Sequence, residues 1–251
     1  MVRNGEVKHT GLIPFLKLQK AAVKSCSQGG LRGGAMTTNY PVWHHDFDSL
    51  IVLKNNKGTE PTRERHIDYC VHFNGYIYKR VLSGQNITLF DPSAKGLYDA
   101  FYSDQDEFAR LYELYEGDPK IMQKSITGTE LFDKVIGERS STGRIYIMHV
   151  DNVNDNSAFD DPIFMTNLCT EIFLPTTPFV DKLDQSGRIA LCTLSNINFG
   201  AFSSPEEMES TIALLARFLD NILSYQDYPL IQAEIATREY RPLGIGVNNL
   251  A

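Results

Sequence analysis

The most informative stretch of the chain runs Thr166-Asn167-Leu168-Cys169-Thr170-Glu171-Ile172-Phe173-Leu174-Pro175. We interpret it as extended backbone, in which successive side chains point to opposite faces. Asn167, Cys169 and Glu171 would then project together, placing an amide, a thiol and a carboxylate on one face. This pattern predicts a reaction centre that the following apolar residues shield from water. The alternative is a buried cysteine at a strand end with two polar neighbours, because a lone match of this kind is weak evidence.

The other three cysteines are widely spaced along the chain. Cys192 lies in a predicted buried strand over 188–194, either as a core residue or as a redox thiol near Cys169. Cys26 and Cys70 fall in helical patterns, and we interpret them as packing residues. Without close cysteine pairs, the sequence favours neither a structural zinc site nor a disulfide framework.

A glycine-rich loop follows the first predicted helix, with the sequence Ser27-Gln28-Gly29-Gly30-Leu31-Arg32-Gly33-Gly34. Glycines permit positive φ and close backbone approach, so the loop could wrap a nucleotide. Gln28 and Arg32 would then supply the polar side chains that contact it. The alternative is a flexible exit from the helix. It is not a phosphate-binding P-loop, because no Gly-Lys-Ser/Thr follows and it comes after a helix rather than before one.

A histidine pair, His44 and His45, stands close to Asp46 and Asp48 and resembles a metal cluster in composition. Adjacent histidines in a strand point to opposite faces and cannot easily share one ion. The sequence therefore predicts no metal site.

Helical and strand patterns alternate along the whole chain, which indicates an α/β architecture. The helices are expected over 12–26, over 63–82, from Asp104 to about Tyr115, after Thr127, and after Ser204-Pro205. The strands are expected over 49–53, 86–90, 145–147 and 188–194.

Composition narrows the class of protein. The chain has 251 residues, of which 42% are hydrophobic and 22% charged, as expected for a globular protein with a sizeable core. The formal net charge of −7 and the lack of a long Lys/Arg run disfavour a nucleic-acid partner. No stretch approaches the ~20 apolar residues of a membrane span, and the first residues form no signal-peptide core. We therefore expect a cytoplasmic protein that does not contact a membrane.

Taken together, the chain resembles the large catalytic subunit of class I ribonucleotide reductase over nearly its whole length. The similarity lies in a series of motifs in the family's order. They are His9-Thr10-Gly11, the stretch 22–34, Val52-Leu53-Lys54-Asn55-Asn56, Leu97-Tyr98-Asp99-Ala100-Phe101, the stretch 141–147, Asn167-Leu168-Cys169-Thr170-Glu171, Ala190-Leu191-Cys192-Thr193-Leu194, and Leu243-Gly244-Ile245-Gly246-Val247.

This resemblance implies that residues 1–251 are the central part of a ten-stranded α/β barrel, incomplete in this chain, with Cys169 on a finger loop inside it. It implies the reduction of ribonucleoside diphosphates for DNA synthesis. Cys169 would become a thiyl radical that abstracts the substrate 3′ hydrogen, and Glu171 would take the 3′-hydroxyl proton. Asn167 would orient the ribose, and Cys192 would be one half of the reducing dithiol.

The resemblance further implies that Ser27, Gln28, Gly29, Gly30 and Arg32 relay the identity of a dNTP or ATP effector to the substrate base. The expected partners are a radical-generating small subunit with a di-iron centre, thioredoxin or glutaredoxin, and the rest of the large subunit; no cofactor is expected to bind this chain directly. The family's other dithiol cysteine, its N-terminal ATP-sensing domain and its C-terminal part are not found in these 251 residues. We therefore expect one piece of a split or truncated subunit, inactive alone.

Two alternatives remain at this point. The first is a non-catalytic remnant or nucleotide-binding piece that keeps the fold without turnover. The second is an unrelated thiol enzyme with Cys169 as nucleophile, which lacks an obvious paired histidine.

Overall fold

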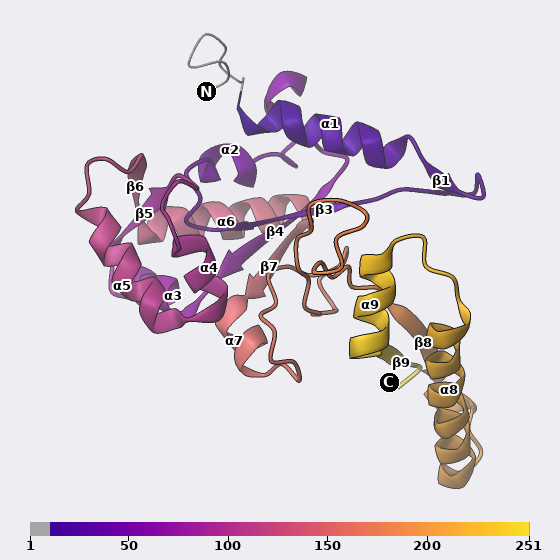
Figure 1. Cartoon of the computed structure of the whole chain (residues 1–251). Coiled ribbons are helices and arrows are strands. Elements are labelled where there is room, and N and C mark those ends of the chain that lie inside the picture. Colours follow the sequence, from indigo (N-terminus) through magenta and orange to yellow (C-terminus); the bar gives the residue numbers. More distant parts are fainter. Residues whose placement is uncertain (1–10, 251) are drawn as a thin grey trace. The chain divides into compact units, whose positions relative to one another are not determined.

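The computed structural model describes residues 11–250, except for the side chain of Gln28, so His9 and Thr10 of the motif series lie outside the described residues. The chain divides into two compact units, one ending at Phe173 and the other beginning at Leu174. Their helices and strands, labelled in Figure 1, confirm the predicted α/β class, and the described strands do not close a barrel. Between residues 11 and 250, no helix combines the length and apolar character needed to cross a membrane.

The first unit contains most of the secondary structure. Its elements are α1 (Leu12–Lys24), β1 (Ser27–Gln28), β2 (Arg32–Gly33), β3 (Thr37–Pro41), α2 (Phe47–Ile51), the 3-10 helix η2 (Glu60–Thr62), β4 (Asp68–Phe73), α3 (Gly75–Leu82), β5 (Asn86–Phe90), α4 (Leu97–Ser103), α5 (Gln105–Glu116), β6 (Gln123–Thr127), α6 (Gly128–Thr142), β7 (Ile145–His149) and α7 (Val150–Asp155).

Three parallel strands in the order β3-β4-β7 form the central sheet of this unit. The middle strand, β4, is buried at five of its six positions, as is typical of a parallel strand covered on both faces. Asn39 on β3 lies opposite Cys70 on β4, which in turn lies opposite Tyr146 on β7. Side chains at such paired positions share a face, so these three residues lie on one side of the sheet.

An antiparallel pair, β5-β6, extends the sheet region beyond the end of β3. The backbone after β3 bridges to β5, because His45 N donates to Phe90 O and Phe90 N donates to Trp43 O. The core beside this junction is rich in aromatic rings: Trp43 meets the ring of Phe101 edge-on at 5.5 Å between centroids. Burial of such rings is a large source of hydrophobic stabilisation in the unit.

Side-chain caps start three helices where the sequence predicted them. Asp104 accepts from Glu107 N at 2.9 Å to begin α5, and Thr127 accepts from Glu130 N at 3.2 Å to begin α6. Ser204 caps α8 (Pro205–Tyr225), with proline at the first helical position. These contacts satisfy amide groups that a helix leaves without intrahelical partners.

Two predictions in the first unit were wrong. Residues 63–82 do not form one helix but β4 followed by α3. The stretch Tyr69-Cys70-Val71 is buried on both faces, as expected for a central strand of a sheet. Asn74 then caps α3 by accepting from Ile77 N at 3.0 Å. Residues 49–53, predicted as a strand, fall in and after the short helix α2, which buries Leu50 and Ile51 against the core.

The second unit contains β8 (Thr193–Asn198), the 3-10 helix η3 (Phe199–Ala201), α8 (Pro205–Tyr225), α9 (Ile231–Tyr240) and β9 (Leu243–Asn248). Its two strands pair in parallel. The strand predicted over 188–194 begins only at Thr193, because Arg188 pairs instead with Thr177 and Ile189 N donates to Gln232 O at 3.3 Å. The helix over Pro205–Tyr225 ends at Gln226, whose backbone is extended.

The cap at Asp104 provides a test of the described packing. Asp104→Ala should lower the free energy of unfolding by about 1 kcal/mol, because one amide at the start of α5 loses its partner. Urea unfolding can be followed by the fluorescence of Trp43, the only tryptophan in the sequence, whose ring lies 5.8 Å from that of Phe108 on α5. Asp104→Asn keeps a capping oxygen and should unfold like the unaltered chain. Equal midpoints for all three proteins would contradict the cap.

Candidate active site

The segment around Cys169 is a tight loop, so the expectation of an extended backbone was wrong. Thr166 and Phe173 form an isolated antiparallel bridge, and the chain turns between them. Thr170 N donates to Asn167 O at 3.3 Å, which closes the turn around Cys169. Alternation of side chains between two faces therefore does not apply here. Cys169 and Glu171 are both exposed, whereas Asn167 is half-buried.

The side chain of Asn167 holds this loop together. Its Oδ1 accepts from the backbone amides of Glu171 and Ile172, each at 3.0 Å. The same residue donates its own backbone N–H to Ile172 O at 3.3 Å. An asparagine that accepts from amides a few residues ahead is a common way to fix a turn. Among the described residues, no hydrogen bond occupies its Nδ2 group, which remains able to donate.

Thr170 adopts the left-handed conformation with φ of 62°, which is unusual for a β-branched residue. Two side-chain contacts hold it there. Its hydroxyl lies 3.2 Å from that of Thr166, and both hydroxyls hydrogen-bond the buried Cys70 thiol beneath the loop. Burial raises the pKa of Cys70 to about 11, and these hydrogen bonds oppose the shift only in part. Cys70 is therefore a packing residue, as predicted, although it lies in a strand.

The loop rests on one face of the central sheet. Thr37 Oγ1 on β3 donates to Leu168 O at 2.5 Å. Tyr146 lies on β7, and its pKa is raised first by burial and then by the charge of Asp68. Cys169 and Glu171 raise this pKa further, so both side chains lie within electrostatic range of the Tyr146 phenol. Sequence reasoning missed these supporting residues. Their contacts join positions more than 100 residues apart in one case and have no local signal.

The glycine-rich segment forms a β-hairpin. Gln28 pairs with Arg32, and Gly29 and Gly30 make the turn with φ of 57° and 71°, a conformation that other residues adopt with strain. Figure 1 shows this hairpin projecting from the end of α1. At its base, a side chain on Gly34 would meet Val23 O at 2.2 Å, so only glycine lets the hairpin pack against the helix.

A cavity of about 560 Å³ connects the hairpin with the Cys169 loop. It is lined by Val23, Cys26, Ser27, Arg32, Gly33, Gly34, Ala35 and Leu168. The structure thus brings two predicted site segments together within the first unit, since Leu168 directly precedes Cys169. Cys26 is exposed at this cavity, so its prediction as a packing residue in a helix was wrong; α1 has ended two residues earlier.

Cys192 lies in the second unit, directly before β8, and its side chain is exposed. The interpretation of Cys192 as a core residue in a buried strand was therefore wrong. Within the described part of the chain, no three His, Cys, Asp or Glu side chains cluster in a way that could hold a metal ion. Of the histidine pair, His44 accepts from Asp46 N through Nδ1 at 3.0 Å.

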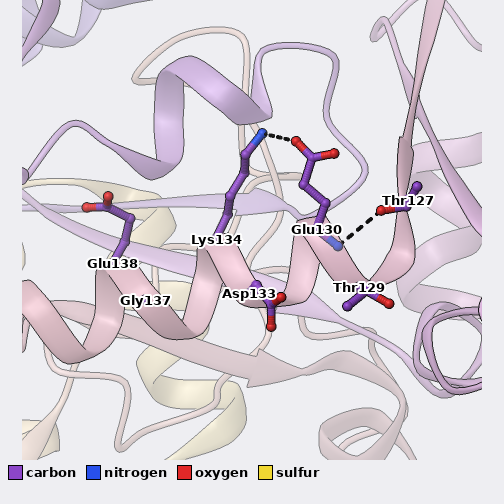
Figure 2. A pocket seen from close by; sticks show the side chains of 7 residues that line it. All are labelled: Thr127, Thr129, Glu130, Asp133, Lys134, Gly137 and Glu138. Carbon is purple, nitrogen blue, oxygen red and sulfur yellow. Dashed lines mark hydrogen bonds and ion pairs between the residues drawn. The ribbon is translucent and has the colours of Figure 1, made fainter.

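A second pocket, of about 590 Å³, lies along α6 and is drawn in Figure 2. Its charged groups are engaged in structural contacts. Lys134 pairs with Glu130 at 2.8 Å and with Asp48 at 3.0 Å, and Glu138 accepts from Asn55 Nδ2 at 2.7 Å. These contacts tie α6 to α2 and to the segment that follows it. The pocket is a product of this packing, and neither a cysteine nor a histidine is among the residues that line it.

The comparisons with known proteins establish the family of the chain. A family model described as "Ribonucleotide reductase, barrel domain" matches residues 1–251. The chain belongs to this family. It is 53% identical over 254 residues to ribonucleoside-diphosphate reductase 1 subunit alpha of Salmonella typhimurium and 52% identical to the protein of that name from Escherichia coli. It is 50% identical to ribonucleoside-diphosphate reductase subunit alpha of Haemophilus influenzae.

These alignments include the whole chain but only part of each relative. They cover 33% of the Salmonella typhimurium and Escherichia coli proteins and 34% of the Haemophilus influenzae protein. The chain therefore spans about a third of the length of the curated relatives it matches, and the barrel-domain model matches it over residues 1–251.

Beneath the loop, the imidazole of His72 is buried, and this burial makes stability depend on pH. Desolvation lowers its pKa from 6.5 to about 3, so the folded protein keeps it neutral. The unfolded chain takes up a proton below about pH 6.5. As pH falls from 6.5 towards 3, His72 should lower the free energy of unfolding by up to about 1.4 kcal/mol per pH unit.

The measurement compares the free energy of unfolding of the unaltered chain with that of His72→Gln at each pH, and unfolding is followed by Trp43 fluorescence. Glutamine can donate and accept hydrogen bonds but cannot be protonated in this range. The two curves of unfolding free energy against pH should be parallel above pH 7 and should approach or cross below pH 6.5. Parallel curves over the whole range would contradict a neutral buried imidazole.

Proposed function

We propose that this chain is the active-site segment of a ribonucleoside-diphosphate reductase large subunit, which reduces ribonucleoside diphosphates to deoxyribonucleotides. The observation that carries this proposal is the cavity between the glycine hairpin and the Cys169 loop. It is a half-open space whose wall includes Leu168, the residue directly before Cys169, in a chain of this family. Because the chain matches a third of each relative, the proposed reaction also uses residues that the relatives carry outside that third.

In the proposed mechanism, Cys169 acts as a thiyl radical and abstracts the 3′ hydrogen of the ribose. A new S–H bond forms while the C3′–H bond breaks, and neither step requires a charge on sulfur. Glu171 accepts the proton of the 3′-hydroxyl as general base, which assists departure of the 2′-hydroxyl. Asn167 would donate from its Nδ2 group to the ribose, since its Oδ1 is used within the loop.

The net reaction requires two electrons from a dithiol. We propose Cys192 as one of these thiols, with the other supplied from outside the 251 residues. The dithiol becomes a disulfide as one of its hydrogens goes to the 2′ carbon and the other to the departing hydroxyl, which leaves as water. A thioredoxin or glutaredoxin then reduces the disulfide. Cys192 is exposed in its own unit, which suits a thiol that must exchange with a partner.

The hairpin would communicate the identity of the specificity effector to the substrate base. Ser27 and Arg32 line the cavity, and Gly29 and Gly30 form the turn between the paired strands. Gln28 is assigned to the same role by its position in the hairpin. A dNTP or ATP effector that shifts the hairpin would change the wall of the cavity that meets the base.

The proposed partners follow from the same family membership. A separate small subunit with a di-iron centre would supply the radical, and the remainder of the large subunit would complete the barrel around residues 1–251. We place this assembly in the cytoplasm, where thioredoxin and glutaredoxin are kept reduced.

Cys169→Ser should abolish ribonucleoside diphosphate reduction in the assembled enzyme, because a hydroxyl cannot replace the thiyl radical. The assay combines this chain with complementary large-subunit segments and the small subunit, and it measures deoxyribonucleotide formed. Nucleotide binding, measured by calorimetry on the same assembly, should stay within about twofold.

Retained reduction in Cys169→Ser would remove the radical assignment. Lack of reduction by the unaltered assembly would favour the alternative of a non-catalytic remnant, and turnover by the isolated chain would refute the need for other segments.

Glu171→Gln should lower the rate of reduction by roughly 10²- to 10⁴-fold, the usual effect of losing a general base. Glu209→Gln is the matched control, because it makes the same chemical change at an exposed carboxylate on α8. The control should retain full activity. Equal rates for Glu171→Gln and the control would exclude Glu171 as the proton acceptor.

A further inference from the structure

A chain of hydrogen-bonded side chains runs from the core of the first unit to the Cys169 loop. It begins at Tyr102 on α4, whose hydroxyl lies 2.8 Å from His72 Nδ1. His72 Nε2 lies 3.0 Å from Asn39 Oδ1. The same oxygen lies 3.4 Å from the Thr166 hydroxyl, which in turn lies 3.2 Å from that of Thr170. The last two residues belong to the loop, so the chain ends on both sides of Cys169.

The direction of these bonds is fixed by Asn39. Its Oδ1 can only accept, so His72 carries its proton on Nε2 and donates it to Asn39. His72 Nδ1 is then the acceptor of the Tyr102 hydroxyl proton. Since burial keeps the imidazole neutral, this arrangement holds across the physiological range of pH. The single proton of the Thr166 hydroxyl is within reach of two acceptors, the same Asn39 oxygen at 3.4 Å and Asn167 O at 3.1 Å.

Asn39 is therefore a junction between two otherwise separate sets of contacts. On one side stands a fully buried imidazole; on the other stands the first residue of the loop. The parallel register places Asn39 opposite Cys70 and Pro41 opposite His72, so the side chains of Asn39, Cys70 and His72 share the face beneath the loop. An apolar residue at this position would leave a buried N–H without an acceptor, which is costly.

We propose that Asn39 and His72 are positioning residues for Cys169. They set where the loop rests on the sheet, because Thr166 begins the loop and Thr170 follows Cys169 directly. This inference rests on the proposed function, in which Cys169 must meet the ribose at bonding distance. A loop detached from β3 would still bind nucleotide but would present its sulfur in many positions, and displacement of about 1 Å is enough to slow such chemistry.

The test uses the full chain and hydrogen–deuterium exchange of the peptide covering 166–173. Asn39→Leu should accelerate exchange of the loop amides about fivefold, as expected for losing one buried hydrogen bond. His72→Leu should do the same, whereas His72→Gln keeps a donor and an acceptor and should restore slow exchange. A peptide from α6 should be unchanged in all three variants.

Tyr112→Phe is the matched control for general loss of stability. Its hydroxyl is buried and bonds the backbone N–H and C=O of Thr88, each at 2.7 Å, and these contacts lie outside the chain beneath the loop. This variant should leave exchange of the loop unchanged. Tyr102→Phe removes one hydroxyl at the far end of the hydrogen-bonded series and should also accelerate loop exchange. It serves as the test if Asn39→Leu does not fold.

In the assembled enzyme, Asn39→Leu should lower kcat at least about tenfold with KM for the nucleoside diphosphate within about twofold, because positioning acts on the reacting sulfur rather than on binding. Unchanged loop exchange in Asn39→Leu, or equal acceleration in Tyr112→Phe, would overturn the inference. If Asn39→Leu does not fold, unchanged loop exchange in Tyr102→Phe would overturn it equally. These outcomes are independent of whether Cys169→Ser retains activity, which tests the proposed function by itself.

Discussion

The register between β3 and β4 is the constraint on which the candidate site depends. Parallel pairing sets Asn39 beside Cys70 and Pro41 beside His72, so one face of the sheet carries the groups that the Cys169 loop contacts. A slip of one residue would turn these groups to the opposite face and would bring residues such as Tyr69 and Val71 beneath the loop in their place. Because β4 is buried on both sides, such a slip is strongly disfavoured, and the position of the loop follows from hydrophobic burial in the sheet.

Elements with a local signal were predictable from the sequence. Three helices begin with a side chain that caps an amide three positions ahead, from Asp104, Thr127 and Ser204. Such contacts can be predicted from a short window of sequence. The strands over 86–90 and 145–147 were also found, since each is a short apolar run. The family, and with it the barrel-domain assignment, was recognised from motifs rather than derived from periodicity, and the family model confirms it.

The remaining differences have a common physical origin in tertiary contacts. Cys70 and Val71 were assigned to a helix because apolar spacing cannot distinguish a doubly buried strand from a buried helix. The loop around Cys169 was predicted as extended, yet its shape depends on Asn167 accepting from the amides of Glu171 and Ile172. It also depends on Thr37, which lies 131 residues away from Leu168. No window of sequence contains both partners. The roles of Asn167, Cys169, Glu171 and Cys192 stay predictions.

The left-handed backbone of Thr170 has a consequence for ligand binding. Glycine would adopt this conformation freely, but it would leave the loop with many alternative shapes in the absence of ligand. Threonine restricts the backbone and also anchors it through its hydroxyl, so the loop has already lost its conformational entropy when the protein folds. A ligand that binds against the loop would then meet a preorganised surface, and little of its binding free energy would be consumed in ordering the segment that bears the thiol.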